Sequence, residues 1–299
     1  MSLPPESRTV DTGVIHDIGY RGYTGPRLGR GYATRSLFTQ SLRAAYGLGR
    51  SGKSKVLPML VLAVVTLPAV VIVALAIVQG RPDLPLDYPG YPSAFGLVVQ
   101  LFVAAQAPVL MSRDLRYHTV PLYFSRPITR GDYVRAKAAA MVVAMLLLMT
   151  APLVVLYLGA VLGGMPFGHN TVHLLYGLLT VAMFALVYSA IGLLIAASTP
   201  RRGFGVAAIM GFLVVGQAIA LIVYGIAGGL AGSPPESANW AGLLSPAWLV
   251  EGLSVQLFGL GGADALHAPG GLGVAVFALE AAALVAGSYW LLRRRYRGI

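Results

Sequence analysis

Apolar residues run along this chain in six long blocks, and the segments between the blocks carry most of the charged residues. A bilayer core requires about 20 consecutive apolar residues per helix, and each block approaches or exceeds that length without a Lys or Arg. The pattern therefore predicts an all-α integral membrane protein with six transmembrane helices inside a domain spanning 57–292. The predicted spans are 57–78, 92–111, 138–162, 172–197, 204–230 and 271–292.

Two shorter segments have a helical pattern outside these spans. From Ala33 to Arg50, apolar residues gather on one arc and arginines on another, which is typical of a helix lying in the plane of the membrane. Ser245 and Pro246 have the form of a helix start, and the residues after them predict a short helix that rests in the outer interface or re-enters it. The remaining segments are an extended cytoplasmic tail (1–32), an interfacial helix with its linker (33–56), a loop (112–137), an outer segment (231–270) and a basic end (293–299).

Composition and charge fix the class and the orientation. Hydrophobic residues make up 57% and charged residues 11% of the 299 residues, whereas a soluble domain carries about 25% charged residues. The absence of cysteine excludes disulfides and Cys-based metal or redox sites. Of the 22 Lys and Arg, only Arg81 falls between spans one and two, on the side opposite the rest. Because cationic loops stay in the cytoplasm, we expect both termini there, in a multi-pass protein of a bacterial-type cell membrane. The charge of +11 is assigned to membrane lipids rather than nucleic acid.

Residues 47–54 match the phosphate-binding P-loop pattern letter for letter. A working P-loop follows a buried strand of a soluble sheet, whereas here an amphipathic helix precedes the pattern and a membrane span follows it. We therefore interpret the pattern as a flexible corner whose Lys53 and Lys55 lie at lipid headgroups.

The loop over 112–137 has an unusual composition for a connection between spans. It contains six cations, two acids and three tyrosines, with apolar residues such as Val120 and Leu122 placed among the charges. Apolar and aromatic side chains beside arginines are typical of a surface that docks a protein. The loop is therefore predicted to be a docking surface.

The same loop carries a family resemblance. Arg113-Asp114-Leu115-Arg116, then Leu122-Tyr123-Phe124-Ser125-Arg126-Pro127-Ile128-Thr129-Arg130, Asp132-Tyr133-Val134 and Lys137-Ala138 resemble the coupling loop of permeases of the type-2 ABC exporter family. The segment 244–252, LSPAWLVEG, resembles the outer segment before their last span. The likeness covers roughly 33–297; the first thirty residues depart from it, and His118-Thr119 stands where the family often has Gly-Thr.

The resemblance implies a permease subunit of an ATP-driven exporter, with a cytoplasmic coupling helix in the loop. Two permease subunits, identical or related, would form the substrate pathway as a dimer, and two copies of an ABC ATP-binding subunit would dock below and use ATP and Mg. The chain itself would be no enzyme and would bind no cofactor or metal. The residues expected to dock the ATPase subunit are Asp114, Arg116, Leu122, Tyr123, Phe124, Arg126, Arg130 and Asp132.

Polar residues inside the spans are the candidates for the pathway. Glu280 is an acid well inside the sixth span, and Gln100, Gln106 and Gln217 add further polar points. An ionisable residue inside a membrane is expensive and usually functional, so Glu280 is read as a substrate contact, a proton-coupled site or a hydrogen-bonded neutral acid. Two alternatives to the exporter stay open: a proton-coupled secondary transporter that uses Glu280, and a membrane scaffold without transport.

Two patterns have weaker functional meaning. His169 and His173 have a spacing at which two imidazoles can share a metal, but two ligands alone bind weakly, and polar residues at a helix start are the preferred interpretation. Glycines at 225, 228, 229 and 232 indicate close helix packing, either at a subunit interface or within one subunit.

Overall fold

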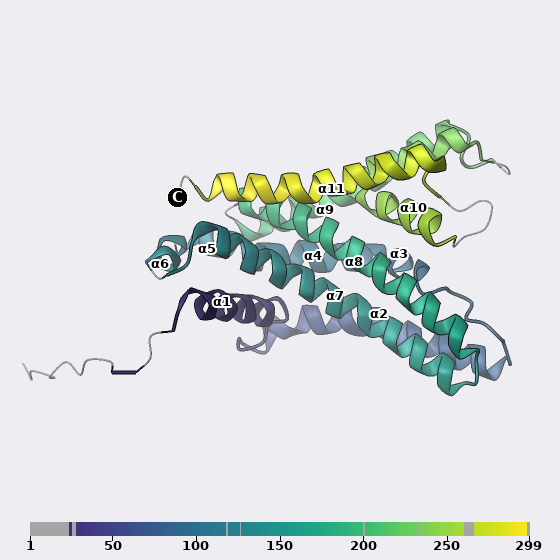
Figure 1. The fold of residues 1–299 in the computed structure, drawn as a ribbon, viewed down its shortest axis with the longest axis horizontal. Coiled ribbons are helices and arrows are strands. Elements are labelled where there is room, and N and C mark those ends of the chain that lie inside the picture. Colours follow the sequence, from purple (N-terminus) through teal and green to yellow (C-terminus); the bar gives the residue numbers. More distant parts are fainter. Residues whose placement is uncertain are drawn as a thin grey trace, which may run out of the picture.

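The computed structural model describes residues 24–25, 28–117, 119–125, 127–199, 201–231, 234–259 and 266–297. Regular structure in these ranges is helical, without a strand, and the long helices run side by side along one axis (Figure 1). Six helical segments here are long and apolar enough to cross a bilayer, which confirms the all-α, six-span prediction at that level. They are α2 (Lys53–Val78), α4 (Gly96–Leu110) continued by α5 (Ser112–Arg116), α7 (Arg130–Leu162), α8 (Phe167–Ser198), α9 (Arg202–Ile226) and α11 (Gly270–Arg295).

Several span ends differ from the sequence prediction: α2 begins at Lys53, α8 at Phe167, and α11 extends to Arg295. Three further differences have local reasons. α7 begins at Arg130, eight residues before the predicted start, because Thr129 and Asp132 form a capping box there. The second span is interrupted at Phe95, which separates α3 (Gly90–Ala94) from α4. α9 ends at Ile226 rather than near 230, because Gly228 adopts a φ of +84° and closes a glycine C-cap.

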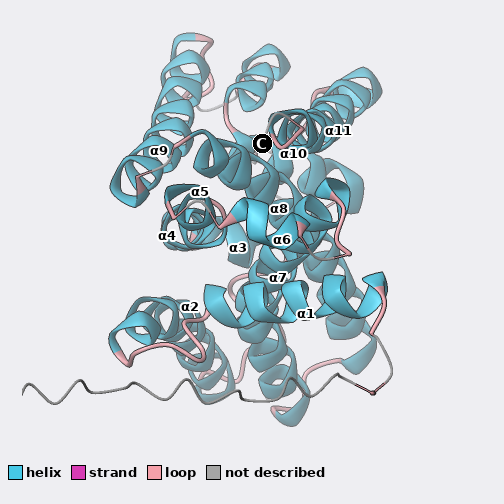
Figure 2. Cartoon of the chain, turned by 90° about the vertical axis from the view of Figure 1, so that its left-hand side faces the viewer, coloured by secondary structure: helices cyan, strands magenta, loops and turns pink. Residues whose placement is uncertain are grey.

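Helix α1 (Arg30–Ala45) lies across one end of the bundle, nearly at right angles to the long helices (Figure 2). It is shorter than the predicted 33–50. Gly47 has a φ of +67°, and the Leu48 N–H donates to the Arg43 carbonyl at 2.7 Å, which terminates the helix in a Schellman motif. The stripe Leu37, Ser41 and Ala45 is buried, and α1 contacts α7 and α4.

The P-loop-like pattern is the corner between α1 and α2. Its first glycine, Gly47, is the C-cap glycine of α1, and a Cβ at this position would lie 2.3 Å from the Ser54 carbonyl oxygen. The pattern follows a helix and opens at Lys53 into α2, the first span. Chain geometry thus explains Gly47 and Gly49, which both have positive φ.

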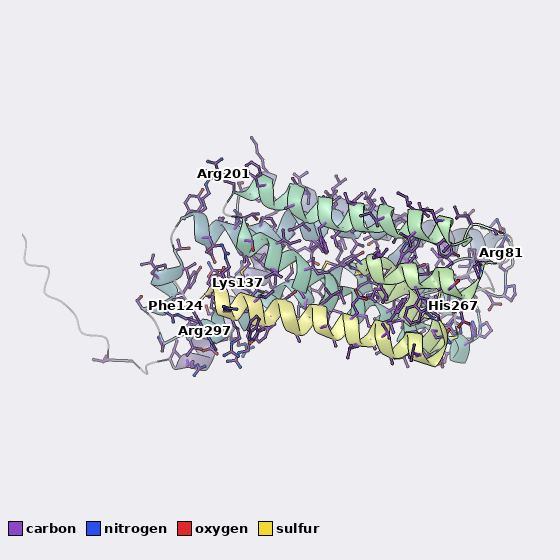
Figure 3. All side chains as sticks on the ribbon, turned by 90° about the horizontal axis from the view of Figure 1, so that it is seen from above. Arg81, Phe124, Lys137, Arg201, His267 and Arg297 are labelled. Atoms are coloured by element: carbon purple, nitrogen blue, oxygen red, sulfur yellow. The ribbon has the colours of Figure 1, made fainter. Side chains whose placement is uncertain are left out.

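Positive charge gathers at the end of the bundle that α1 crosses. Figure 3 shows Lys137, Arg201 and Arg297 at this end and Arg81 at the other. We call the two ends the basic end and the opposite end. The most buried layer lies on α4, α7 and α8, where Phe102, Met145 and Tyr188 are fully enclosed.

The outer segment forms a compact insertion at the opposite end. The 3-10 helix η1 (Glu236–Leu244) is followed by α10 (Pro246–Phe258), which packs among α8, α9 and α11 (Figure 1). Leu249 and Leu253 are buried in a cluster that includes Phe277 of α11. The Ser245 hydroxyl finds no partner among the described residues, so the helix starts on the backbone bond from Leu249 N–H to the Ser245 carbonyl, 2.8 Å, instead of the predicted side-chain cap.

Candidate functional site

The loop after α4 folds into two short helices at the basic end. These are α5 (Ser112–Arg116) and α6 (Val120–Phe124), and α6 lies close to the C-terminal end of α11 (Figure 2). Tyr117 and Leu122 are 63% and 67% exposed. Large apolar side chains with this exposure, at the end of the molecule farthest from Arg81, form an accessible surface.

A buried ion pair fastens this loop to α7. The Lys137 ammonium lies 2.8 Å from Asp114 Oδ2, and the two side chains are 7% and 9% exposed. The Tyr133 hydroxyl donates to the same carboxylate oxygen at 2.9 Å. The ammonium also lies 6.0 Å and 5.5 Å from the ring centres of Tyr123 and Tyr133, within cation–π range. The charges of Lys137 and Asp114 therefore neutralise each other in a buried position, and the hydrogen bond from Tyr133 further stabilises the carboxylate.

Aromatic contacts extend the ion pair to the last helix. The Tyr133 ring centre lies 5.6 Å from Tyr123, 6.1 Å from Phe124 and 5.1 Å from Tyr296, which follows α11. Tyr296 is fully buried, and its hydroxyl donates to the sulfur of Met111 at 3.8 Å. We call Asp114, Tyr123, Phe124, Tyr133, Lys137 and Tyr296 the loop cluster. It joins α5, α6, α7 and α11 in one contact network.

Asp132 forms a second ionic centre beside the loop cluster. Its carboxylate accepts from Arg30 Nη2 at 3.0 Å and from Arg135 Nη2 at 2.6 Å, and it closes the capping box with Thr129. The hydrogen bond from Arg30 is the main reason that the pKa of Asp132 is held well below its usual range, although burial opposes the shift. The pair ties the first turn of α1 to the first turn of α7.

The structure sorts the predicted docking residues into two groups. Asp114, Tyr123 and Phe124 come together in the loop cluster, while Asp132 is paired with Arg30. The residues that stay accessible are Arg116, Leu122 and Arg130. Arg126 and His118 lie outside the described residues. Docking by this loop stays a prediction, and the exposed residues are the ones able to touch a partner.

Three residues of the loop cluster, Tyr133, Lys137 and Tyr296, were missed by the sequence analysis. Tyr133 and Lys137 are one helical turn apart on α7 and are both buried. Their i, i+4 spacing beside Asp114 in the same loop was the available signal. A lysine next to a membrane span reads as a headgroup contact, and only the packing reveals that it points inward.

Among the candidate pathway residues, Gln100 and Gln217 meet. Gln100 Nε2 donates to Gln217 Oε1 at 3.2 Å and to the Tyr188 hydroxyl at 3.3 Å. Gln100 is 1% exposed, and its Oε1 has no partner among the described residues. Gln106 is buried farther along α4. Glu280 is half-buried on α11 and, within the described ranges, hydrogen-bonds to none of these glutamines.

Glu251 is a polar residue that the sequence analysis did not select. It belongs to α10, which contacts α3 and α8, and it interacts with Ser93 of α3. The sequence analysis predicted this segment as a short helix that rests in the outer interface or re-enters it, and it selected no polar residue there.

The histidine pair has a local partner at the opposite end. The rings of His169 and His173 lie 3.9 Å apart, and His173 Nδ1 lies 3.0 Å from Asp87 Oδ1. No group of three or more potential metal ligands occurs in the described part of the chain.

Comparison with known proteins identifies no family for this chain. No protein-family model matches it, and no curated protein matches it at a significant level. Six apolar helices suggest a multi-pass membrane protein.

Proposed function

We propose that this chain is the membrane-spanning permease subunit of an ATP-driven exporter, powered by separate ATP-binding subunits that dock on α5 and α6. The observation that carries the proposal is the combination of an exposed loop tip with a buried anchor. Leu122 is 67% exposed, while Asp114 and Lys137, from the same loop and the start of α7, form a buried ion pair. A partner can therefore pack against the exposed Leu122 side chain, and the buried ion pair holds the loop that carries Leu122 to α7.

The loop cluster provides the mechanical link in this proposal. A side chain buried in close packing transmits displacement, because protein interiors are dense and barely compressible. Movement of α6 would press on Tyr133 through Tyr123 and Phe124, and Tyr133 contacts Tyr296. α7 and α11 would therefore move with the loop as rigid bodies, and ATP-driven closure in the partner would reorient them.

A second permease subunit, identical or related, would complete the pathway. α9 and α11 bury little of their apolar surface within one chain: Ile222 is 60% exposed and Leu279 is 73% exposed. These faces are available to lipid or to a second subunit. Gln100 and Gln217, which are hydrogen-bonded at 3.2 Å, are the first candidates for polar contacts with a transported molecule. Gln106 and Glu280 are further candidates.

The basic end is assigned to the cytoplasm by the positive-inside rule. Lys137, Arg201 and Arg297 lie there and Arg81 at the other end (Figure 3). Reporters fused after Ile299 and before Leu57 should therefore be cytoplasmic, and tags near His169 or in the segment 233–268 should be accessible from outside. An extracellular carboxyl terminus would contradict the orientation.

The docking test uses an exposed residue outside the loop cluster. Leu122→Asp should abolish copurification of an ATPase subunit, because a charge at the centre of an interface cannot be buried without a partner, and it should leave folding intact. Leu257→Asp is the matched control, since Leu257 is 54% exposed near the end of α10 and lies outside the six spans. Wild-type recovery of the ATPase subunit with Leu122→Asp would refute docking on α6.

The same experiment separates the exporter from its alternatives. A proton-coupled transporter would need no ATPase subunit, and its transport would depend on Glu280 and on a pH gradient. A scaffold would show neither ATPase recovery nor transport. Capture of an ATP-hydrolysing partner that is lost with Leu122→Asp distinguishes the exporter from both.

A further inference from the structure

Arginines from three separate elements line one cavity at the basic end. The cavity has a volume of about 750 Å³ and lies between α1, the corner that follows it, and α5. Arg35 and Arg43 reach it from α1, Arg50 from the corner and Arg113 from α5. A second cavity of about 220 Å³ shares Arg50 and Arg113 and adds Arg116 and Arg202.

No acid balances these arginines in the part of the chain that the structure describes. The ion pairs there engage Arg30, Arg135, Lys137 and His173 instead. Burial, and then the charges of Arg113 and Arg202, lower the pKa of Arg50. Positive groups are therefore held together against their mutual repulsion, an arrangement that an anionic ligand would relieve.

The polar face of α1 forms one wall of this cavity. Tyr32, Ser36 and Thr39 line it with Arg35 and Arg43, while the opposite stripe of α1 is buried in the protein. Guanidinium groups with neighbouring hydroxyls match the oxygens of a phosphate group, to which arginine donates two parallel hydrogen bonds.

An apolar border beside the arginines points to a lipid. Leu48 lines the same cavity and is 43% exposed. The first two turns of α2, just after the corner, expose Val56 and Leu60 by 63% and 59%. Cationic groups next to an exposed apolar helix at the start of a membrane span are the surroundings of a lipid with its headgroup at the interface.

We propose that this arginine-lined cavity is a specific site for the phosphate headgroup of an anionic membrane lipid, whose acyl chains lie along Leu48 and the start of α2. The inference requires only that the basic end lies at a membrane surface, and it is independent of the exporter proposal. It also gives the P-loop-like corner a role: Gly47 and Gly49, both at positive φ, turn the chain so that Arg50 faces Arg113.

The test measures lipid binding by the full chain, purified in detergent, with native mass spectrometry. Phosphatidylglycerol should bind saturably and displace phosphatidylcholine. The double variant Arg50→Gln/Arg113→Gln should weaken phosphatidylglycerol binding roughly thirtyfold, equivalent to about 2 kcal/mol, because each basic residue near the surface contributes about 1 kcal/mol. Arg294→Gln/Arg295→Gln is the matched control: it removes the same charge from exposed positions on α11 that line neither cavity, and its affinity should stay within a factor of about three.

Several results would overturn the proposal. Equal losses in both double variants would mean that general surface charge attracts the lipid. Inorganic phosphate that displaces the lipid at equal concentration and constant ionic strength would assign the cavity to a free anion. Unchanged lipid binding with loss of a copurifying protein would assign the arginines to a protein partner. If Arg50→Gln/Arg113→Gln fails to fold, Arg35→Gln/Arg43→Gln tests the same cavity, since both side chains are exposed on α1.

Discussion

Removal of Lys137 from the loop cluster should be one of the most damaging single changes at the basic end. Lys137→Met keeps the volume of the side chain but deletes its charge. Asp114 then stays buried, 9% exposed, with one hydrogen bond from Tyr133 at 2.9 Å. The variant therefore leaves a carboxylate without its cation in a site from which water is excluded.

The expected magnitude follows from the geometry. At 2.8 Å and an effective dielectric constant of about 20, the attraction between the two charges is about 6 kcal/mol. Desolvation of both ions offsets most of this, so the pair adds little net stability. Breaking it from one side costs about 3–5 kcal/mol, because the remaining charge stays buried. Because the Tyr133 hydroxyl still donates a hydrogen bond to the Asp114 carboxylate, we expect a destabilisation at the lower end of this range, about 3 kcal/mol.

The assay is reversible unfolding of the purified chain in mixed micelles, read as a change in the free energy of unfolding. A double-mutant cycle with Asp114→Asn isolates the pair, and the double variant should be milder than Lys137→Met alone. Arg135→Met is the matched control: its side chain is 60% exposed, and an exposed ion pair contributes only about 0–1 kcal/mol.

Equal destabilisation by Lys137→Met and Arg135→Met would refute the reasoning, as would single changes that add without coupling. The loop would then be held by its aromatic contacts alone. The ion pair would then not be the anchor that connects the loop to the spans in the proposed function.

Three further predictions test the packing, the cap and the glycine corner. Gly159→Ala should cost about 1–3 kcal/mol, because its Cβ would lie 2.3 Å from Val73 Cγ1, whereas Gly211→Ala, with no neighbour within 4 Å, should be neutral or slightly stabilising in the same unfolding assay. Asp132→Asn should cost about 1 kcal/mol at pH 7, because it removes the ion pairs with the exposed Arg30 and Arg135 and weakens the capping box. Because the Arg30 hydrogen bond lowers the pKa of Asp132, the difference from wild type should persist down to about pH 4, the carboxyl pKa in the unfolded chain. It should shrink only as the pH falls further towards the folded-state pKa. Lys53→Ala should leave ATP hydrolysis by the assembled complex nearly unchanged and the isolated chain should bind no nucleotide in a filter assay; loss of hydrolysis at normal assembly would mean that the P-loop-like pattern is functional.

The sequence alone determined the number and the class of the long helices. A run of apolar residues has the same meaning in any fold, because the bilayer thickness sets the length that a helix needs. Ends marked by local chemistry were also available in principle: Thr129 with Asp132 is a capping box and Gly47 a C-cap glycine. The predicted start of α7 is too late because the apolar run begins eight residues after the capping box. The predicted end of α1 is too late because the amphipathic pattern continues past Gly47.

Only the tertiary structure decided which polar residues face each other. Lys137 beside a span has the same local sequence pattern whether it points to lipid headgroups or to Asp114, and burial between α5 and α7 settles the choice. Gln100 and Gln217 are far apart in the chain and meet because α4 packs against α9. Arg50 and Arg113 share a cavity because the chain turns at Gly47, after the end of α1. Contacts of this kind depend on packing between distant segments, about which the periodicity of a single helix carries no information.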